Sequence, residues 1–102
     1  MAKTRIMYVE QETGNEDGPA WIGLVTCSKT GRTIYYRDFI LHRFKLVFGN
    51  HYNEVTGDAF WVSGVKQDGS DRLYGNSPVH VDDDVRDEHW TFRKTGIRTK
   101  SL

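Results

Sequence analysis

Residues 28–48 read SKTGRTIYYRDFILHRFKLVF and hold the clearest secondary-structure signals in the chain. Thr30-Gly31 predicts a tight turn, because glycine readily adopts the positive φ that hairpin turns require. The segment Thr33–Leu41 is rich in β-branched and aromatic residues, which favour a strand. Phe44, Leu46 and Phe48 occupy every second position. This period of two is typical of a strand with one buried face. These signals predict antiparallel strands joined by short turns.

Turn signals recur at short spacing on both sides of this stretch. Residues 14–19, 56–58, 68–69 and 75–78 are rich in glycine, asparagine, aspartate and proline, which mark turns and loops. Between them the sequence predicts strands at Arg5–Glu10, Trp21–Cys27, Ala59–Lys66, Arg72–Tyr74 and Val79–Val81. We therefore predict a mainly β fold, a small curved sheet or SH3-like barrel of five to seven short strands with one C-terminal helix.

The last quarter of the chain changes character. Three aspartates at residues 82–84 precede apolar or aromatic side chains at positions 85, 89 and 92, and Arg93-Lys94 and then Gly96 follow. Acidic residues at the start, basic residues in the last turn and a glycine beyond it are typical of a helix. We predict a helix near residues 83–94 with one of the aspartates as its N-cap. This gives a single domain over residues 1–96 and a flexible tail over residues 97–102.

Length and composition bound the protein's class. A chain of 102 residues is one domain by size, and an aromatic content of 13% indicates a folded one. The 14 basic residues balance 14 acidic residues, which excludes a uniformly basic nucleic-acid coat and an acidic tail protein. Cys27 is the single cysteine, so no internal disulfide is available. We see no apolar run long enough for a signal peptide or a membrane span, so we expect a cytoplasmic protein with no membrane partner.

The balanced total hides an uneven distribution of charge. Residues 20–52 carry a net charge of +4, residues 53–90 carry −6 and residues 91–102 carry +4. The first of these segments is also rich in aromatic residues. Basic side chains interleaved with aromatic rings on a curved sheet suit single-stranded nucleic acid or another anionic partner, since cations follow phosphates and rings stack on bases. The candidate ligand-binding residues are Lys29, Arg32, Tyr35, Arg37, Arg43 and Lys45.

Strand alternation sharpens this hypothesis. If Tyr36 points inward, then Tyr35, Arg37 and Phe39 point outward. The predicted surface is a basic aromatic hairpin on which Tyr35 and Arg37 lie beside the basic turn at residues 29–32. In a simpler interpretation the aromatic residues form the core, and the basic residues are a solvated face that complements the acidic second half of the chain.

Two other functions stay open. In the first, the protein is an interaction or self-assembly module, and residues 20–52 of one copy meet the acidic residues 53–90 of a second copy, as in a homodimer, or of another protein. In the second, it is a small enzyme or metal-binding protein that uses Cys27 or a pair formed by His42 and His51 across a hairpin. The histidine spacing matches no metalloprotease helix, and the turn at residues 28–33 lacks the order of a phosphate-binding loop. We therefore expect neither catalysis nor a resident metal or cofactor.

Three stretches together resemble a known family. They are residues 28–36 (SKTGRTIYY), residues 60–64 with 68–74 (FWVSG and DGSDRLY), and residues 81–86 with Trp90 (VDDDVR). The set is similar to a family of small uncharacterised bacterial proteins of about this length, over residues 18–90. Some members carry the label of deoxyxylulose-phosphate synthase, an enzyme that must enclose thiamine diphosphate and a metal between large α/β domains. A β-rich chain of 102 residues cannot build that enclosure. The resemblance implies a small, bacterial, cytoplasmic protein and brings no activity or site residue with it.

Overall fold

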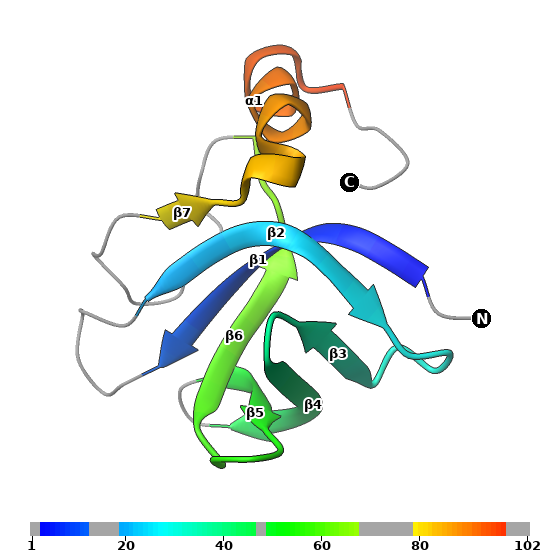
Figure 1. Cartoon of the computed structure of the whole chain (residues 1–102), viewed down its shortest axis with the longest axis vertical. Helices are drawn as coiled ribbons and strands as arrows, with labels where there is room; N and C mark the ends of the chain where they lie inside the picture. Colours follow the sequence, from blue (N-terminus) through cyan, green and yellow to red (C-terminus); the bar gives the residue numbers. More distant parts are fainter. Residues whose placement is uncertain (1–2, 13–18, 47–48, 68–78, 98–102) are drawn as a thin grey trace.

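The computed structural model describes residues 3–12, 19–46, 49–67 and 79–97 (Figure 1). Within them, seven strands precede a short helical segment at the C-terminal end. The elements are β1 (Lys3–Glu12), β2 (Ala20–Cys27), β3 (Thr33–Tyr36), β4 (Phe39–Leu46), β5 (Gly49–Asn53), β6 (Ala59–Gly64), β7 (Val79–Val81), the 3-10 turn η1 (Asp83–Val85) and the helix α1 (Arg86–Thr95).

Strands β1 to β6 form a closed antiparallel barrel. Each strand pairs with the next one along the chain, and β1 also pairs with β6, which closes the ring. Strand β7 lies outside the ring and runs parallel to Ala20–Ile22 of β2, a part of β2 that β3 does not reach. The prediction of a small barrel of five to seven strands with a C-terminal helix is confirmed. The more specific SH3-like arrangement stays a prediction.

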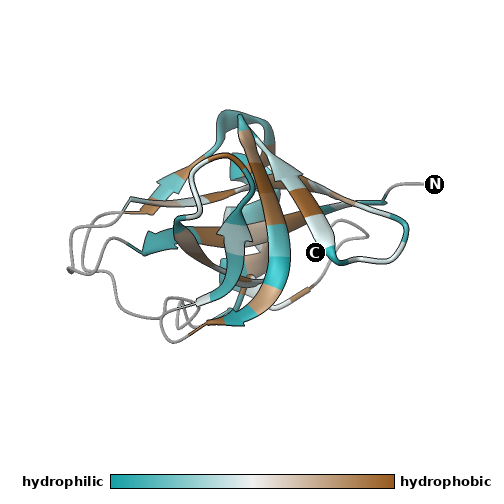
Figure 2. Cartoon of the chain, turned by 90° about the horizontal axis from the view of Figure 1, so that it is seen from below, coloured by the Kyte–Doolittle hydropathy of each residue, from teal (hydrophilic) through white to brown (hydrophobic). Residues whose placement is uncertain are grey.

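Alternation along the strands separates two hydrophobic clusters on opposite faces of the curved sheet. Figure 2 shows hydrophobic and hydrophilic bands alternating along the strands. The cluster inside the barrel consists of Val9, Val25, Ile34, Tyr36, Leu41, Phe60 and Val62. The cluster outside it, which α1 joins through Phe92, consists of Ile6, Tyr8, Ala20, Ile22, Val65, Val85 and Phe92. A barrel of this few strands has room inside only for its own side chains, so its centre is a packed core.

The C-terminal helix ends as predicted but begins differently. Gly96 has a left-handed backbone with φ of 74°, and its N–H donates to the carbonyl of Phe92, which closes the last turn. At the other end, the 3-10 turn η1 comes before α1, and no aspartate side chain caps either element. Asp82 therefore occupies the predicted N-cap position, but the side-chain capping bond is absent. The carboxylate of Asp82 is instead bonded to Tyr36 and Arg37 on the barrel, and this contact competes with capping.

The predicted third strand, Thr33–Leu41, is in fact two strands. Arg37 has a left-handed backbone with φ of 53°, and Arg37-Asp38 form a two-residue turn between β3 and β4. The turn resets the alternation, so Phe39 faces inward and lies 5.0 Å from the ring of Phe60, centre to centre. The prediction that Phe39 points outward is wrong. An arginine at a position of positive φ gives no turn signal in the sequence, which explains the error.

Two further features of the hairpin region differ from prediction. Strand β5, Gly49–Asn53, has no clear strand signal, because its residues are mostly polar. Phe44, expected on a buried face, is 60% exposed, and the ladder between β4 and β5 shifts register between Arg43 and Leu46, which breaks the period of two. The predicted strand Arg72–Tyr74, the turn at residues 68–69 and residues 98–102 of the predicted tail lie outside the described residues.

Candidate functional site

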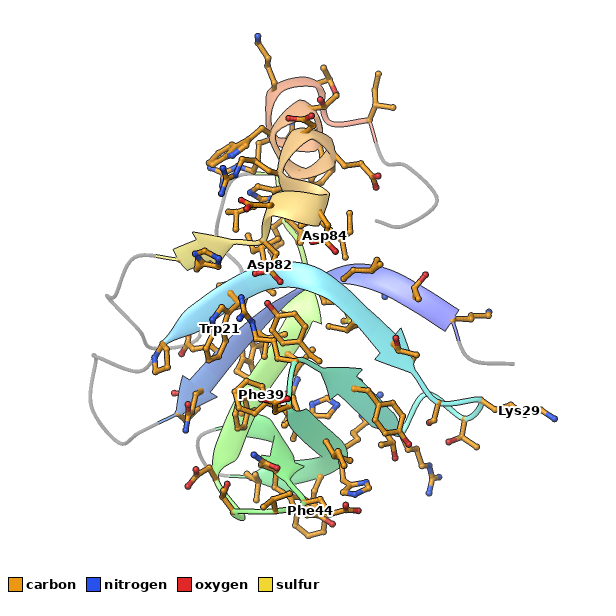
Figure 3. All side chains as sticks on the ribbon, in the orientation of Figure 1. Trp21, Lys29, Phe39, Phe44, Asp82 and Asp84 are labelled. Carbon is orange, nitrogen blue, oxygen red and sulfur yellow. The ribbon has the colours of Figure 1, made fainter. Side chains whose placement is uncertain are left out.

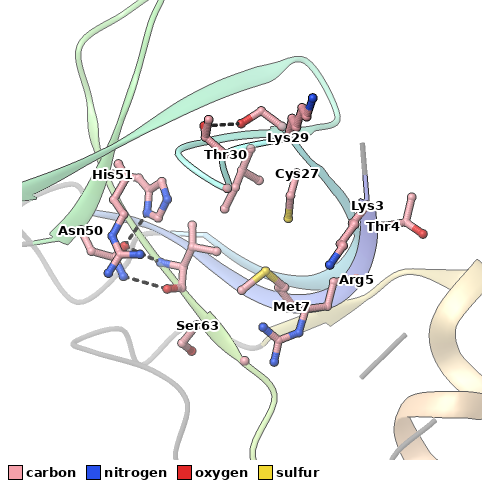
Figure 4. Close-up of a pocket in the computed structure, with 16 residues that line it drawn as sticks. Lys3, Thr4, Arg5, Met7, Cys27, Lys29, Thr30, Asn50, His51 and Ser63 are labelled. Carbon is pink, nitrogen blue, oxygen red and sulfur yellow. Dashed lines mark hydrogen bonds between the residues drawn. The ribbon is translucent and has the colours of Figure 1, made fainter. Parts of the chain in front are cut away.

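One end of the barrel opens into a cavity of about 630 Å³ (Figure 4). All six barrel strands and the loop between β2 and β3 contribute to its wall. Four of the side chains that line it are cationic, and we call these four the cationic mouth. Its members are Lys3, Arg5, Lys29 and Arg43.

Strand alternation brings three of these cations to the inner face of the barrel. Lys3 and Arg5 share a face of β1 with Met7, which packs against the inner cluster. Arg43 follows Leu41 by two residues in β4, and Leu41 is fully buried in that cluster. Inward positions are therefore apolar in the middle of the barrel and cationic at this end. The fourth cation, Lys29, extends from the loop between β2 and β3 (Figure 3).

The mouth has a strongly one-sided charge. None of the described residues that line the cavity is Asp or Glu. A second hollow of about 410 Å³ shares Arg43 with the cavity and adds Arg32 and Lys45. The whole chain has equal numbers of basic and acidic residues, so this gathering of like charge does not reflect its average composition. Like charges at one place repel each other, and a bound anion relieves that repulsion. The mouth and the second hollow can therefore hold an anion.

A histidine lies on the cavity wall beside these cations. His51 is opposite Arg43 in the register of β4 and β5 and is only 5% exposed. The Asn50 side chain donates to the carbonyl of Val62 at 2.8 Å, and its Oδ1 accepts from the N–H of Val62 at 2.9 Å, which fixes the orientation of the amide. The same Oδ1 lies 2.8 Å from Nδ1 of His51, so Nδ1 must carry the proton. Nε2 is then the free lone pair of the neutral ring.

The environment of His51 keeps this ring neutral. Burial, followed by the nearby charges of Arg43 and His42, lowers the pKa of His51 to about 4. Its Nε2 is shielded from solvent and meets no hydrogen-bond partner among the described residues. The cavity wall therefore offers a buried acceptor atom among cationic donors.

An exposed ring and a half-buried ring lie side by side on the outer face, next to the second hollow. Phe44 lines that hollow together with Arg32 and Lys45. The ring of Phe44 meets the ring of Tyr52 edge to face, with centres 6.2 Å apart, and Tyr52 also contacts His42 at 5.4 Å. We call Phe44 and Tyr52 the outer aromatic strip. Such rings give a stacking surface beside the cations.

The structure distributes the six predicted ligand-binding residues over several places. Lys29 and Arg43 belong to the cationic mouth, and Arg32 and Lys45 belong to the second hollow. Tyr35 is 46% exposed but is not among the residues that line either cavity. Four of the six are thus gathered at one end of the barrel.

Arg37 lies at the opposite end of β3 from the basic turn. Its Nη2 donates to Oδ1 of Asp82 at 2.6 Å, and Oδ2 of Asp82 accepts from the hydroxyl of Tyr36 at 2.6 Å. The guanidinium also lies over the ring of Trp21, 5.6 Å from its centre. We call Tyr36, Arg37 and Asp82 the Asp82 clasp, because together they fasten the end of β7 to the barrel. Tyr35 and Arg37 therefore do not form one surface with the basic turn, since the hairpin turn takes Arg37 away from it.

The two histidines proposed as a pair lie on opposite faces of the sheet. His42 faces outward, with Nε2 2.8 Å from the carboxylate of Glu54 and Nδ1 3.1 Å from the hydroxyl of Thr33, whereas His51 faces inward. The proposed contact between them is wrong. His42 pairs with Tyr52, whereas His51 pairs with Arg43, so the two histidines are one position apart in the ladder and point to opposite faces of the sheet. In the described part of the chain, no group of three His, Cys, Asp or Glu side chains could hold a metal ion. Cys27 is partly buried and lines the cavity.

Sequence reasoning missed Lys3, Arg5 and His51 as parts of the site. A signal for the first two was available, because Lys3 and Arg5 fall on the same face as Val9 if the strand is extended to residue 3. The prediction began this strand at Arg5 and so left Lys3 out of it. No local signal exists for His51, which reaches the mouth through the pairing of β5 with β4.

Comparisons with protein-family models, with curated proteins and with solved structures find no match for this chain. The resemblance to a family of small bacterial proteins therefore stays a prediction. Among the helices of the described residues, none has both the length and the apolar character needed to cross a lipid bilayer.

Proposed function

We propose that the protein is a binding domain for single-stranded nucleic acid, held at the cationic mouth and along the second hollow. The observation that supports this most is the gathering of Lys3, Arg5, Lys29 and Arg43 around one cavity whose described lining holds no acidic side chain. Phosphate contacts by such cations provide most of the affinity for nucleic acid.

The outer aromatic strip supports a single strand over a duplex. Phe44 is largely exposed beside Arg32 and Lys45, so a strand whose phosphates follow these cations passes a ring on which a base can stack. In a duplex the bases are already stacked on each other and present only their edges.

Several cations of this region form no ion pair with the described residues. Among the described residues, the ion pairs engage Arg37 but none of Lys29, Arg43 and the two cations of the second hollow. Arg37 therefore does pair with the acidic half of the same chain, as the simpler interpretation of the basic segment expects. This pairing leaves Lys29, Arg43 and the two cations of the second hollow available for a ligand.

The salt dependence of binding tests the proposal. For a single strand, log Kobs falls with log salt by about 0.7 for each phosphate contact, so four contacts shared between the mouth and the second hollow predict a slope of about −2.8. The measurement is fluorescence anisotropy of a 3′-fluorescein dT10 oligonucleotide between 50 and 300 mM NaCl, about the range in which such contacts dominate. A slope near zero at measurable affinity would contradict phosphate contacts.

A matched pair of double variants localises the contacts. Lys29→Gln with Arg43→Gln removes two cations of the mouth, and Arg93→Gln with Lys94→Gln removes the same two residue types from α1. We expect the first to reduce the magnitude of the salt slope by about 1.4 and the second to leave it unchanged, although both change the net charge equally. Equal losses in both would mean that binding follows the overall charge and that the mouth is not the site.

A second pair of variants tests stacking. We expect Phe44→Ala to weaken oligonucleotide binding by about 5-fold to 150-fold, the range for one stacked base. Trp90→Ala removes another exposed ring, on α1, and should leave the affinity unchanged. A poly-glutamate peptide serves as competitor: if it displaces dT10 as well as unlabelled dT10 does, the ligand is an anionic peptide rather than nucleic acid.

Self-assembly through the two oppositely charged segments stays a hypothesis, as does the cytoplasmic location. This self-assembly is the alternative to nucleic-acid binding, whereas a cytoplasmic location belongs to the proposal itself. Gel filtration at about 0.05 and 0.5 M NaCl tests self-assembly, because the Debye length falls to a few ångströms at the higher salt. A dimer that dissociates at high salt would favour pairing of residues 20–52 with residues 53–90 of a second copy.

A further inference from the structure

The outer face of α1 carries a large aromatic ring that the core leaves exposed. Phe92 and His89 of this helix are buried, whereas Trp90 is 51% exposed. The Trp90 ring is nevertheless held in place, because its centre lies 4.8 Å from that of the His89 ring and 5.7 Å from the guanidinium carbon of Arg93. An exposed ring that is already ordered loses little conformational freedom when a partner covers it, which is typical of the centre of an interface.

Two charged side chains of opposite sign flank this ring. Asp87 lies three residues before Trp90 and Lys94 lies four residues after it, and both are exposed. Residues three or four apart on a helix are neighbours, so the three side chains form one stripe about 10 Å long. None of the ion pairs formed by the described residues includes Asp87 or Lys94, whereas the adjacent Asp83 and Arg86 pair with each other at 2.6 Å. The stripe therefore presents an acid, a ring and a base to a partner.

The order of these groups makes the stripe complementary to itself. When two copies of α1 pair antiparallel about Trp90, Asp87 of each copy lies opposite Lys94 of the other copy, and the two rings meet at the centre. A parallel pair would instead place like charges opposite each other, which costs free energy. A twofold contact between identical chains requires the antiparallel arrangement, in which residue i meets residue j and residue j meets residue i.

The position of α1 in the fold suits a contact with a second copy. The helix lies at one end of the long axis of the molecule, beyond β2 (Figure 1). It contributes no residue to the cavity of the cationic mouth or to the second hollow. Pairing through α1 therefore leaves the mouth of each copy open, unlike pairing that uses the basic residues 20–52.

We propose that the outer face of α1 is the interface of a weak homodimer, in which two helices pair antiparallel around Trp90 and Asp87 forms an ion pair with Lys94 at each end. Helix α1 has 10 residues and is about 15 Å long, so the contact is smaller than a standard interface of about 1,600 Å². We therefore expect a Kd between about 10 µM and 1 mM. In oligonucleotide titrations and thermal melts at about 1 µM the chain is then a monomer.

The wild-type protein provides the first test. Sedimentation velocity and NMR amide spectra are recorded between about 20 µM and 1 mM protein in about 50 mM NaCl. We expect the mass to rise towards that of a dimer, with amide shifts over residues 86–95 and none at Lys29 or Arg43. A mass that stays that of the monomer overturns the proposal, as do shifts at Lys29 and Arg43 in place of α1.

Charge reversal tests the antiparallel register. In its homodimer Asp87→Lys sets two bases opposite each other at each end, and Lys94→Glu sets two acids there. We expect either variant alone to associate at least about tenfold more weakly than the wild type. Mixed one to one, the two variants restore opposite charges at both ends, so the mixture should associate about as tightly as the wild type. A mixture that stays monomeric overturns the proposal.

A matched control separates this interface from the pairing of oppositely charged segments. Lys29→Glu makes the same charge change as Lys94→Glu, but on the wall of the mouth cavity. We expect Lys29→Glu to associate like the wild type. A loss in Lys29→Glu equal to that in Lys94→Glu would assign the dimer to residues 20–52 and overturn the role of α1.

Trp90→Ala tests the centre of the contact and covers the failure of a charge variant to fold. Alanine favours a helix and the ring is exposed, so we expect the circular-dichroism spectrum to stay that of the wild type. Self-association should weaken at least about tenfold, as it does when a central aromatic residue is truncated. Phe44→Ala removes another exposed ring, on β4, and should leave self-association unchanged. Undiminished association of Trp90→Ala overturns the proposal, whether or not Asp87→Lys folds.

Discussion

Replacing Asp82 with alanine tests how the segment before α1 is held to the barrel. The substitution removes the acceptor for the hydroxyl of Tyr36 at 2.6 Å and for Nη2 of Arg37 at 2.6 Å. Tyr36 belongs to the inner cluster, so its hydroxyl proton is left without the acceptor that it now has. The Asp82 side chain itself is 17% exposed, and Arg37 keeps its contact with the Tyr36 oxygen at 3.2 Å.

The two lost bonds have different strengths. A hydrogen bond to a mostly buried carboxylate contributes about 1.5–3 kcal/mol to the free energy of unfolding. The ion pair with Arg37 contributes about 0.2–1 kcal/mol, because the Arg37 side chain is 43% exposed and solvent screens the pair. Together we expect a loss of about 2–4 kcal/mol. For a domain of this size, that loss lowers Tm by roughly 10–25 °C.

The assay is thermal denaturation followed by circular dichroism, with Asp84→Ala as the matched control. Asp84 is exposed two residues further on, so the same substitution there should change the free energy of unfolding by less than about 0.5 kcal/mol. A double-mutant cycle with Tyr36→Phe isolates the hydroxyl–carboxylate bond and should give a coupling energy of about 1–2 kcal/mol. If Asp82→Ala and Asp84→Ala melt within 2 °C of each other, a value below the expected loss on this scale, the clasp does not stabilise the fold.

Three further predictions concern the rest of the fold. Burial raises the pKa of Glu12 from 4.5 to about 8. The unfolded chain therefore releases this proton at a lower pH than the folded chain does, and the free energy of unfolding falls as pH rises between these two values. Glu12→Gln should flatten that fall in melts at about pH 5 and 8.5, and an unchanged profile would contradict the prediction. Gly96→Ala should cost about 1–2 kcal/mol in urea denaturation, because φ is 74° and a Cβ would lie 3.0 Å from Gln67; a midpoint equal to that of the wild type would count against this. Phe92→Ala should cost about 3–5 kcal/mol while Trp90→Ala, on the exposed face of α1, costs less than about 0.5, and similar values for both would show that the helix does not pack as described.

Most of the barrel could be predicted because its signals are local. β-branched and aromatic runs identify β2, β3 and β6, glycine identifies the turns at Gly31 and Gly57, and Gly96 identifies the end of α1. Each of these signals depends on the conformational preference of one or a few residues, which a short window of sequence contains.

The candidate site could be predicted only in part, because long-range pairing assembles it. Lys29 and Arg43 lie in the segment whose charge the sequence makes obvious, and both line the cavity. Arg5 joins them because β1 closes on β2 and β6, and His51 joins them because the polar strand β5 pairs with β4. Alternation along β1 gives the face on which Arg5 lies, but the strand pairings that bring Arg5 and His51 to the cavity have no local signal. Arg37 shows the reverse error, since a charged residue that looks free in the sequence is bound by an aspartate 45 positions away.

The double pairing of β1 has a consequence for how the chain assembles. This strand is synthesised before the other five of the ring, yet its ladder with β6 joins Met7 to Gly64 and needs nearly the whole ring to be present. Closing a loop of that length costs conformational entropy that nearest-neighbour hairpins do not, so ring closure is expected to be the slow step of folding. Until it occurs, β1 presents an unpaired edge and so does the last strand added to the sheet, β5 or β6, and either edge can pair with another copy. A chain stopped before Ala59 would keep both edges open, so the last barrel strand to be made protects the first from aggregation.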